Sequence, residues 1–259
     1  MALPGAGVEE EDVVAELVER AREIGVAETL ARVKDRIEKE NRWRMFAAYL
    51  YQAEHDSANA VKMVDWVLSE YDKLSPQQQD VALRLAGSVY LTAEPKPLVD
   101  KAQDAYARLL KKYPDDLSSL NNMACLLAES VSPPRPEQAL TYSLRAYNLM
   151  EQRGIMMPLV LDTHGWVLTL CGRLDEGISI LRQALEKDQF VDGYYHLGEA
   201  YLVKQYPEEA KKQLTSAQEM IDKAAKTNNP VDSSLKRKVA QATQRAEDML
   251  RAKGQAKAQ

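Results

Sequence analysis

The chain has 259 residues, of which 45% are hydrophobic and 28% charged, a composition typical of a folded globular protein rather than a disordered or collagen-like one. Its 34 Lys and Arg against 39 Asp and Glu give a net charge of −5. This charge argues against a nucleic-acid binder, because such a protein needs surplus positive charge to neutralise phosphates. Two cysteines are too few for a disulfide-stapled scaffold or a cysteine-rich metal site. With 11 Gly and 11 Pro to interrupt helices, the composition favours an all-α fold.

Membrane and export signals are missing from the sequence. No run of 18 apolar residues occurs, so we predict no transmembrane helix and no direct insertion into a membrane. The first seven residues lack the basic segment and apolar core of a signal peptide. We therefore expect a cytoplasmic location, unless the chain is a fragment of an exported protein.

Residues 1–40 are predicted to form an N-terminal helical extension. Apolar residues recur at helical spacing before and after Gly25, which we expect to break the segment into two helices. The acidic run Glu9–Asp12 is interpreted as a solvated first turn, where negative charge suits the helix dipole. An acidic docking patch is the alternative interpretation.

Residues 41–222 repeat one pattern of small and large side chains. In the clearest unit, Gly165 is followed at 3, 12, 16 and 19 residues by Leu168, Gly177, Leu181 and Ala184. The next unit keeps these offsets from Gly198, 33 residues later. Three earlier units keep both halves of the pattern, two of them with a longer connection. We predict five helical hairpins over residues 41–74, 76–114, 117–153, 158–190 and 191–222.

Small residues recur where the two helices of one hairpin must approach closely. A bulky side chain there would push the helix axes beyond the roughly 8–10 Å of a packed pair. Each hairpin has apolar residues on both of its faces and cannot bury them without a neighbour. The pattern therefore predicts a stack of hairpins.

Residues 223–259 are predicted to form a capping helix and a basic tail. Asp232 and Ser234 can begin a helix that continues to about Lys253, with one apolar face that includes Val239 and Ala246. This segment has nine Lys or Arg against three Asp or Glu. A solvated cap explains this charge, and a binding site is the alternative.

The repeated pattern resembles the tetratricopeptide repeat (TPR). That motif has 34 residues, a small residue at its eighth and twentieth places, and often proline at its thirty-second place, which Pro114 matches in the second unit. The resemblance covers about 70% of the chain. It implies an all-α, right-handed α-solenoid of TPR-like hairpins with flanking N- and C-terminal helices. TPR arrays serve many processes, so the resemblance indicates fold far more strongly than function.

No catalytic or metal-binding arrangement is apparent among the titratable residues. His164 occupies a large-apolar place before Gly165 and is interpreted as a packed histidine, while His196 is expected near a seam between helices and His55 at a helix end. No two of these histidines have the spacing of metal ligands on one helix, and no glycine-rich phosphate loop is present. We therefore predict no enzymatic activity, no metal and no cofactor.

The resemblance implies that the first helix of each hairpin lines an inner, concave face through the second, fifth, ninth and twelfth places of the motif. We call the side chains chosen from these places the inner-place residues. They form the predicted partner-binding site: Met45, Tyr49, Leu83, Tyr90, Asn121, Cys125, Asp162, Trp166, Thr169, Tyr195, Glu199 and Leu202.

The composition of these residues limits the ligand. Among the places that would hold the basic and amide residues of a carboxylate clamp, Asn121 alone fits, so capture of an acidic C-terminus is not expected. Tyr and Trp are frequent interface anchors, and Asp162 and Glu199 favour a ligand with Lys or Arg. We expect a protein or peptide partner with apolar and basic residues, and no nucleic acid. The oligomeric state is not predicted.

The predicted function is a non-catalytic scaffold for protein–protein interaction. The segments Asn121–Ala128 and Asp162–Val167 resemble units of bacterial arrays that form the C-terminal part of larger proteins. A regulatory or substrate-recruiting module of a larger enzyme or envelope assembly is therefore one alternative. An RNA-binding helical repeat is a second alternative, which the acidic total charge disfavours.

Overall fold

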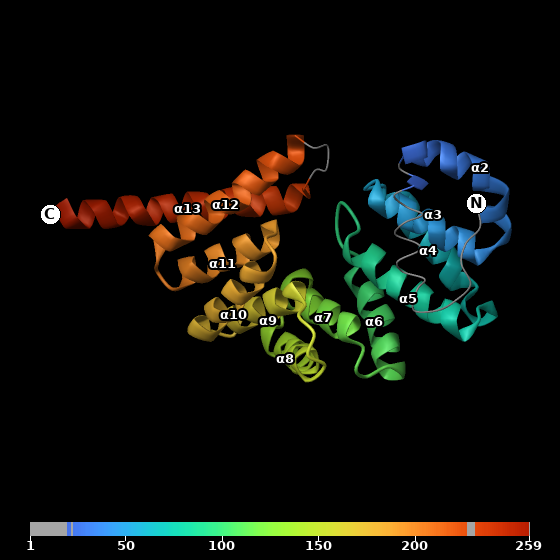
Figure 1. Ribbon diagram of the computed structural model, residues 1–259, viewed down its shortest axis with the longest axis horizontal. Coiled ribbons are helices and arrows are strands. Elements are labelled where there is room, and N and C mark those ends of the chain that lie inside the picture. Colours follow the sequence, from blue (N-terminus) through green and yellow to red (C-terminus); the bar gives the residue numbers. More distant parts are fainter. Residues whose placement is uncertain (1–19, 22, 227–230, 259) are drawn as a thin grey trace. The chain divides into compact units, whose positions relative to one another are not determined.

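The computed structural model describes residues 20–21, 23–226 and 231–258, and every regular element in these ranges is helical (Figure 1). The predicted all-α class is confirmed. The α-helices are α2 (Val26–Lys39), α3 (Asn41–Ala53), α4 (Ser57–Ser69), α5 (Pro76–Leu91), α6 (Val99–Lys112), α7 (Leu117–Cys125), α8 (Pro136–Gln152), α9 (Pro158–Leu170), α10 (Leu174–Lys187), α11 (Val191–Val203), α12 (Pro207–Lys226) and α13 (Ser233–Ala258).

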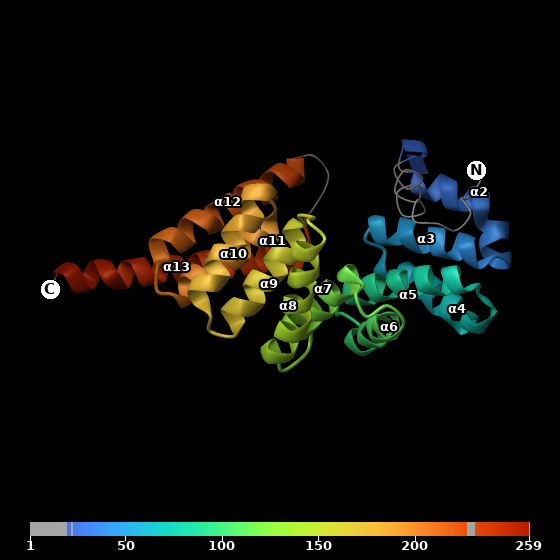
Figure 2. The same ribbon diagram turned by 60° about the horizontal axis from the view of Figure 1, so that its bottom comes forward.

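The helices divide into two compact units. Unit 1 runs to Leu126 and includes Ser130–Ser132, and unit 2 contains Leu127–Glu129 and the chain from Pro133 onward. In unit 1, α3 packs against α4 and α5 against α6, and in unit 2 α9 packs against α10 and α11 against α12 (Figure 2). The predicted third hairpin, 117–153, spans the division, because α7 belongs to unit 1 and α8 to unit 2.

Several helices begin at the capping residues that the sequence offers. Ser75 and Gln78 form a capping box at the start of α5, in which the Gln78 backbone N–H donates to Ser75 Oγ and the Ser75 backbone N–H donates to Gln78 Oε1. Asp56 and Asp116 accept backbone N–H bonds at the starts of α4 and α7. Proline occupies the first position of α5, α8 and α9, where its missing N–H costs no helical bond.

Gly25 breaks the N-terminal segment as predicted. Its φ of 103° lies in the region that only glycine adopts readily, and α2 begins at the next residue. Residues 20, 21, 23 and 24 before it are helical. The acidic run Glu9–Asp12 lies outside the described residues.

The small residues of the repeat lie at close helix contacts. A Cβ added to Gly198 would lie 2.7 Å from Leu214 Cγ, and one added to Gly177 would lie 2.7 Å from the Gly165 carbonyl oxygen. Ala184, Ala210 and Ala217 are fully buried. The structure therefore confirms why this pattern needs small side chains.

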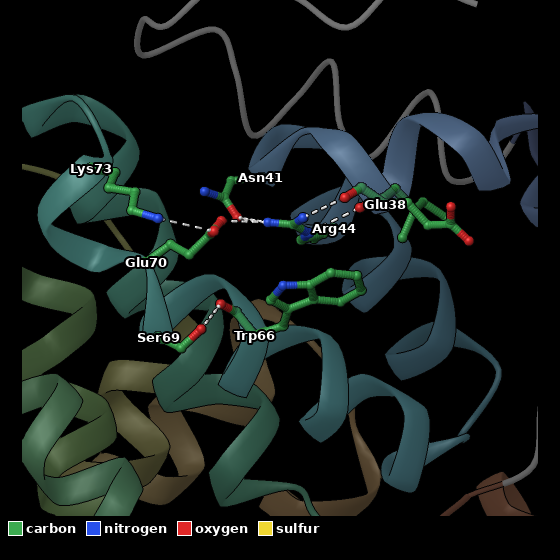
Figure 3. A network of polar contacts seen from close by, with 8 residues as sticks. Glu38, Asn41, Arg44, Trp66, Ser69, Glu70 and Lys73 are labelled. Carbon is green, nitrogen blue, oxygen red and sulfur yellow. Dashed lines mark hydrogen bonds and ion pairs between the residues drawn. The ribbon is translucent and has the colours of Figure 1, made fainter.

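A buried arginine joins three segments of unit 1 (Figure 3). The Arg44 guanidinium donates to the backbone carbonyls of Ile37 and Glu38 at 2.9 and 2.7 Å, and to Asn41 Oδ1 at 2.7 Å. It also forms an ion pair with Glu70 and lies 3.9 Å from the centre of the Trp66 ring. These contacts connect the end of α2 to the end of α4 through one side chain of α3.

The C-terminal helix α13 packs against α11 and α12 of unit 2 (Figures 1 and 2). Val239, Ala242 and Ala246 are completely buried in a core shared with Leu214 and Ala217 of α12. The predicted apolar face of this helix is therefore confirmed. The helix continues to Ala258, beyond the expected end near Lys253, and in both views it extends past the other helices of its unit.

The turn that follows α7 is not α-helical. α7 ends at Cys125, and the turn Leu126–Ser130 is π-helical, with the Val131 N–H donating to the Leu126 carbonyl at 3.1 Å. Pro133 and Pro134 follow, and prolines cannot supply the N–H groups that would continue an α-helix.

Candidate functional site

The inner-place residues of unit 1 differ in exposure. Met45, Leu83 and Tyr90 are buried, whereas Tyr49, Asn121 and Cys125 are half-buried. The buried three present almost no area to another molecule.

Tyr90 is held by contacts inside unit 1. Its hydroxyl donates to Asp65 Oδ1 of α4 at 2.5 Å, and Lys101 Nζ of α6 lies 5.1 Å from the ring centre. Burial and the neighbouring Asp65 carboxylate raise the pKa of the Tyr90 hydroxyl above its usual range. Tyr90 therefore packs between hairpin helices, in contrast to the partner contact expected from its place in the repeat.

Two inner-place residues of unit 2 also pack between helices. The Thr169 hydroxyl donates to the Gly165 carbonyl at 2.9 Å, and a Cβ on Gly177 would lie 2.5 Å from the Thr169 oxygen. Leu202 belongs to the core that α13 completes. Both side chains are about 5% exposed or less, so they stabilise the hairpins rather than form a surface.

The other four inner-place residues of unit 2 gather around a buried histidine. His196 is 5% exposed, and its Nδ1 lies 2.9 Å from Asp162 Oδ2 of α9. Its Nε2 lies 3.3 Å from Glu129 Oε1, which comes from the turn after α7. We name this group the His196 cluster; its members are Glu129, Asp162, Trp166, Tyr195, His196 and Glu199.

Aromatic rings cover the imidazole of the cluster. Trp166 stacks on His196 with ring centres 4.8 Å apart and 12° between the planes, and Tyr195 lies 6.5 Å from Trp166. Trp166 is half-buried, and its indole N–H is buried without an acceptor among the described residues. Trp166 and Tyr195 thus lie close together, and both rings pack between α9 and α11.

The two carboxylates determine the charge of His196. Burial by itself disfavours the imidazolium, but Asp162 and Glu129 outweigh it and raise the pKa of His196 well above its usual value. Burial would raise the pKa of Glu129, yet His196 and Lys238 together lower it to about 2. The cluster therefore holds a protonated histidine beside the ionised Glu129 carboxylate at neutral pH.

Two basic side chains of α13 form ion pairs with carboxylates of the cluster. Lys238 Nζ lies 2.9 Å from Glu129 Oε2 and 5.8 Å from the centre of the Tyr195 ring. Arg245 forms an ion pair with Glu199, whose side chain is 8% exposed. Each carboxylate of the cluster therefore has a cationic neighbour within unit 2, so Asp162 and Glu199 are not open acidic groups as the sequence suggested.

The interpretation of His164 as a packed histidine is confirmed. It is 5% exposed, stacks on Tyr147 with ring centres 4.9 Å apart, and lies 3.1 Å from the Ser143 hydroxyl. Burial lowers its pKa to about 4, so it is neutral at pH 7. Ser143 is only 1% exposed, and this Ser–His pair is therefore inaccessible to a substrate.

Sequence reasoning missed Glu129, Lys238, Arg245 and Arg44. Lys238 and Arg245 are seven residues apart, which places them on the same side of a helix, and this spacing was the available signal for α13. No sequence pattern identified Glu129, because its partner Lys238 lies 109 positions later in the chain. Arg44 was one of many arginines on predicted helix faces.

Within the described residues, no three His, Cys, Asp or Glu side chains are arranged to hold a metal ion. Likewise, none of the helices in these ranges is long and apolar enough to cross a membrane.

Known proteins with a similar structure identify the fold. A thermophilic TPR protein of Thermus thermophilus is 20% identical, with a TM-score of 0.56 over 78% of this chain and 98% of that one. PilW, a widely conserved type IV pilus biogenesis factor, is 17% identical, with a TM-score of 0.57 over 84% of this chain and 92% of that one. No protein-family model matches the sequence, and no curated protein is significantly similar to it. The paired helices, their small contact residues and these likenesses together show that the chain has a TPR-like repeat fold.

Proposed function

We propose that this protein is a non-catalytic scaffold that binds a segment of another protein, with Trp166, the half-buried ring of the His196 cluster, as its main contact. Stacked helical hairpins present extended surfaces built from many side chains, and such repeat arrays generally serve as interaction modules. The cluster combines two aromatic rings with charged groups, which is the composition of many interface hot spots.

The observation that carries the proposal is the state of Trp166. This side chain is half-buried, lies flat on His196, and has an indole N–H without an acceptor among the described residues. Buried polar groups are usually hydrogen-bonded, and tryptophan is favoured in interfaces because it buries large area and can still donate one bond. Because this N–H is itself buried, a bound segment would contact the part of the Trp166 ring that remains exposed.

Unit 1 offers a second contact region in this proposal. Tyr49, Asn121 and Cys125 are the inner-place residues there that retain exposed area. The buried Asn121 Oδ1 has no donor among the described residues, so a partner would contact the exposed part of this side chain instead. We propose that these residues form a separate contact region on unit 1.

The test compares Trp166→Ala with Tyr206→Ala. Tyr206 lies in the same unit, is 45% exposed and is outside the cluster, so it is a matched aromatic control. Partners cross-linked to the parent chain in cells are identified, purified and measured by calorimetry. We expect Trp166→Ala to weaken binding by about 2 kcal/mol and Tyr206→Ala to change it little.

Circular dichroism must show the same helical content in all three proteins. Equal affinity of the parent and Trp166→Ala would contradict the proposal. Salt-dependent RNA binding by the parent would instead support the RNA-binding alternative.

A further inference from the structure

The side of α13 that faces the His196 cluster carries the two basic residues of the network. Lys238 and Arg245 are separated by seven residues, or about two helical turns, and they contact Glu129 and Glu199 respectively. The neighbouring face of α13, with Val239, Ala242 and Ala246, is fully buried against α11 and α12. The apolar face thus holds the helix in place, and the two basic side chains extend from it onto the cluster.

In each of these two ion pairs, the carboxylate side chain is less exposed than the basic side chain. The Glu199 side chain is 8% exposed and that of Arg245 is 55%, while the Glu129 side chain is 27% exposed and that of Lys238 is 43%. A buried carboxylate needs a cation, because an unpaired buried charge is strongly unfavourable. A mostly exposed cation loses little when it returns to water. The carboxylates therefore require a positive charge, but another cation could supply it.

Two other ion pairs of α13 lie away from the cluster. Lys211 of α12 pairs with Glu247 at 3.0 Å, and Lys253 lies 3.3 Å from Glu208 of α12. All four of these side chains are at least one-third exposed, so their pairs depend little on burial. They provide matched controls, since they also join α13 to unit 2 but do not touch the cluster.

We propose that α13 occupies the His196 cluster in cis, so that Lys238 and Arg245 stand where two basic side chains of a partner segment would bind. This inference rests on the proposed function and specifies the partner as a segment with two Lys or Arg about two helical turns apart. When the partner binds, its basic side chains replace Lys238 at Glu129 and Arg245 at Glu199. The apolar face of α13 stays packed against α11 and α12. The occupied cluster binds such a partner more weakly than an open one.

The experiment uses the full chain and a synthetic peptide with the sequence of residues 232–250, which carries both basic residues at the required spacing. Fluorescence anisotropy measures its affinity for the parent, for Lys238→Ala/Arg245→Ala, and for the control Lys211→Ala/Lys253→Ala. We expect the first double variant to bind the peptide about tenfold more tightly than the parent, and the control to bind like the parent. A peptide with Gln in place of both basic residues should lose this gain.

Equal affinity of the folded double variant and the parent would overturn the proposal, and so would the same gain in the control. If the double variant does not fold, the single variants Lys238→Gln and Arg245→Gln are measured, and at least one must show the gain. The result of this experiment can be distinguished from the result of the Trp166→Ala experiment. Loss of partner binding in Trp166→Ala with no gain in the double variant would leave the scaffold function standing and reject occupation by α13.

Discussion

His196 lies flat against Trp166, with 4.8 Å between the ring centres and 12° between the ring planes. The same imidazole is within 2.9 Å of Asp162 and 3.3 Å of Glu129. One side chain of α11 thus joins the half-buried Trp166 ring to the buried charges of the cluster. Changes at His196 should therefore affect both stability and the surface that Trp166 presents.

His196→Gln should lower the free energy of unfolding by roughly 3 kcal/mol. The substitution removes the imidazolium and leaves Asp162 and Glu129 as partly buried carboxylates without it. Adding Asp162→Asn should recover part of the loss, because one of the two carboxylates is then neutral. Urea unfolding of the single and double variants measures both effects. The exposed His55, changed to Asn, is the control, and an equal loss there would contradict this role of His196.

The charge of His196 also predicts a loss of stability at high pH. Its pKa is raised in the folded state, so the stability it contributes is complete below its usual value near 6.5 and is lost as the pH rises through the raised pKa. The parent should therefore lose stability on the alkaline side more steeply than His196→Gln. Thermal unfolding from pH 7 to pH 10 compares the two. Parallel curves would show that His196 is not charged in the folded protein.

The lowered pKa of His164 predicts that the protein also loses stability at acidic pH. Its pKa is lowered from 6.5 to about 4 in the folded state, so its contribution is present above 6.5 and is lost as the pH falls towards 4. Between pH 7 and pH 5 this loss is about 2 kcal/mol. His164→Gln, which keeps a polar group near Ser143, should lack this part of the pH dependence. Urea unfolding at the two pH values gives the difference.

Gly198→Ala should destabilise unit 2 by about 1–3 kcal/mol. The added Cβ would lie 2.7 Å from Leu214 Cγ and 2.8 Å from Leu214 Cδ2, inside the packed seam between α11 and α12. Gly254→Ala is the control, since no atom lies within 4 Å of the added Cβ and alanine favours a helix. Thermal unfolding should show opposite shifts for the two variants. A neutral Gly198→Ala would mean that the seam can widen at little cost.

Arg44→Lys should destabilise unit 1 by about 3 kcal/mol, although it keeps the charge. A lysine ammonium cannot reproduce the planar fork that bonds two carbonyls, Asn41 and Glu70 while stacking on Trp66. Arg42→Lys is the control, because Arg42 is half-exposed and pairs with Glu40 at the surface, where a salt bridge contributes less than about 1 kcal/mol. Similar stability of both variants in urea would contradict the structural role of Arg44.

Most of this fold could be predicted from local features of the amino-acid sequence. The offsets from Gly165 and Gly198, the capping box at Ser75 and the prolines at helix starts are local features, and each acts through residues less than one repeat away. Such patterns survive in a linear sequence because helix periodicity and close helix contacts depend on near neighbours. His164 was recognised as a packed residue for the same reason, since its place in the repeat is an apolar one.

The accessibility of the inner-place residues and the pairing of their charges could not be predicted, because both depend on contacts between helices that are distant in the sequence. Tyr90 has the same place in its repeat as Thr169, but its contacts with Asp65 and Lys101 come from two other helices. Glu129 meets Lys238 because α13 packs on α11 and α12, and no local spacing encodes a pair separated by 109 residues. The free energy of an ion pair depends on burial and on geometry across helices, whereas a repeat pattern specifies only the face on which each side chain begins.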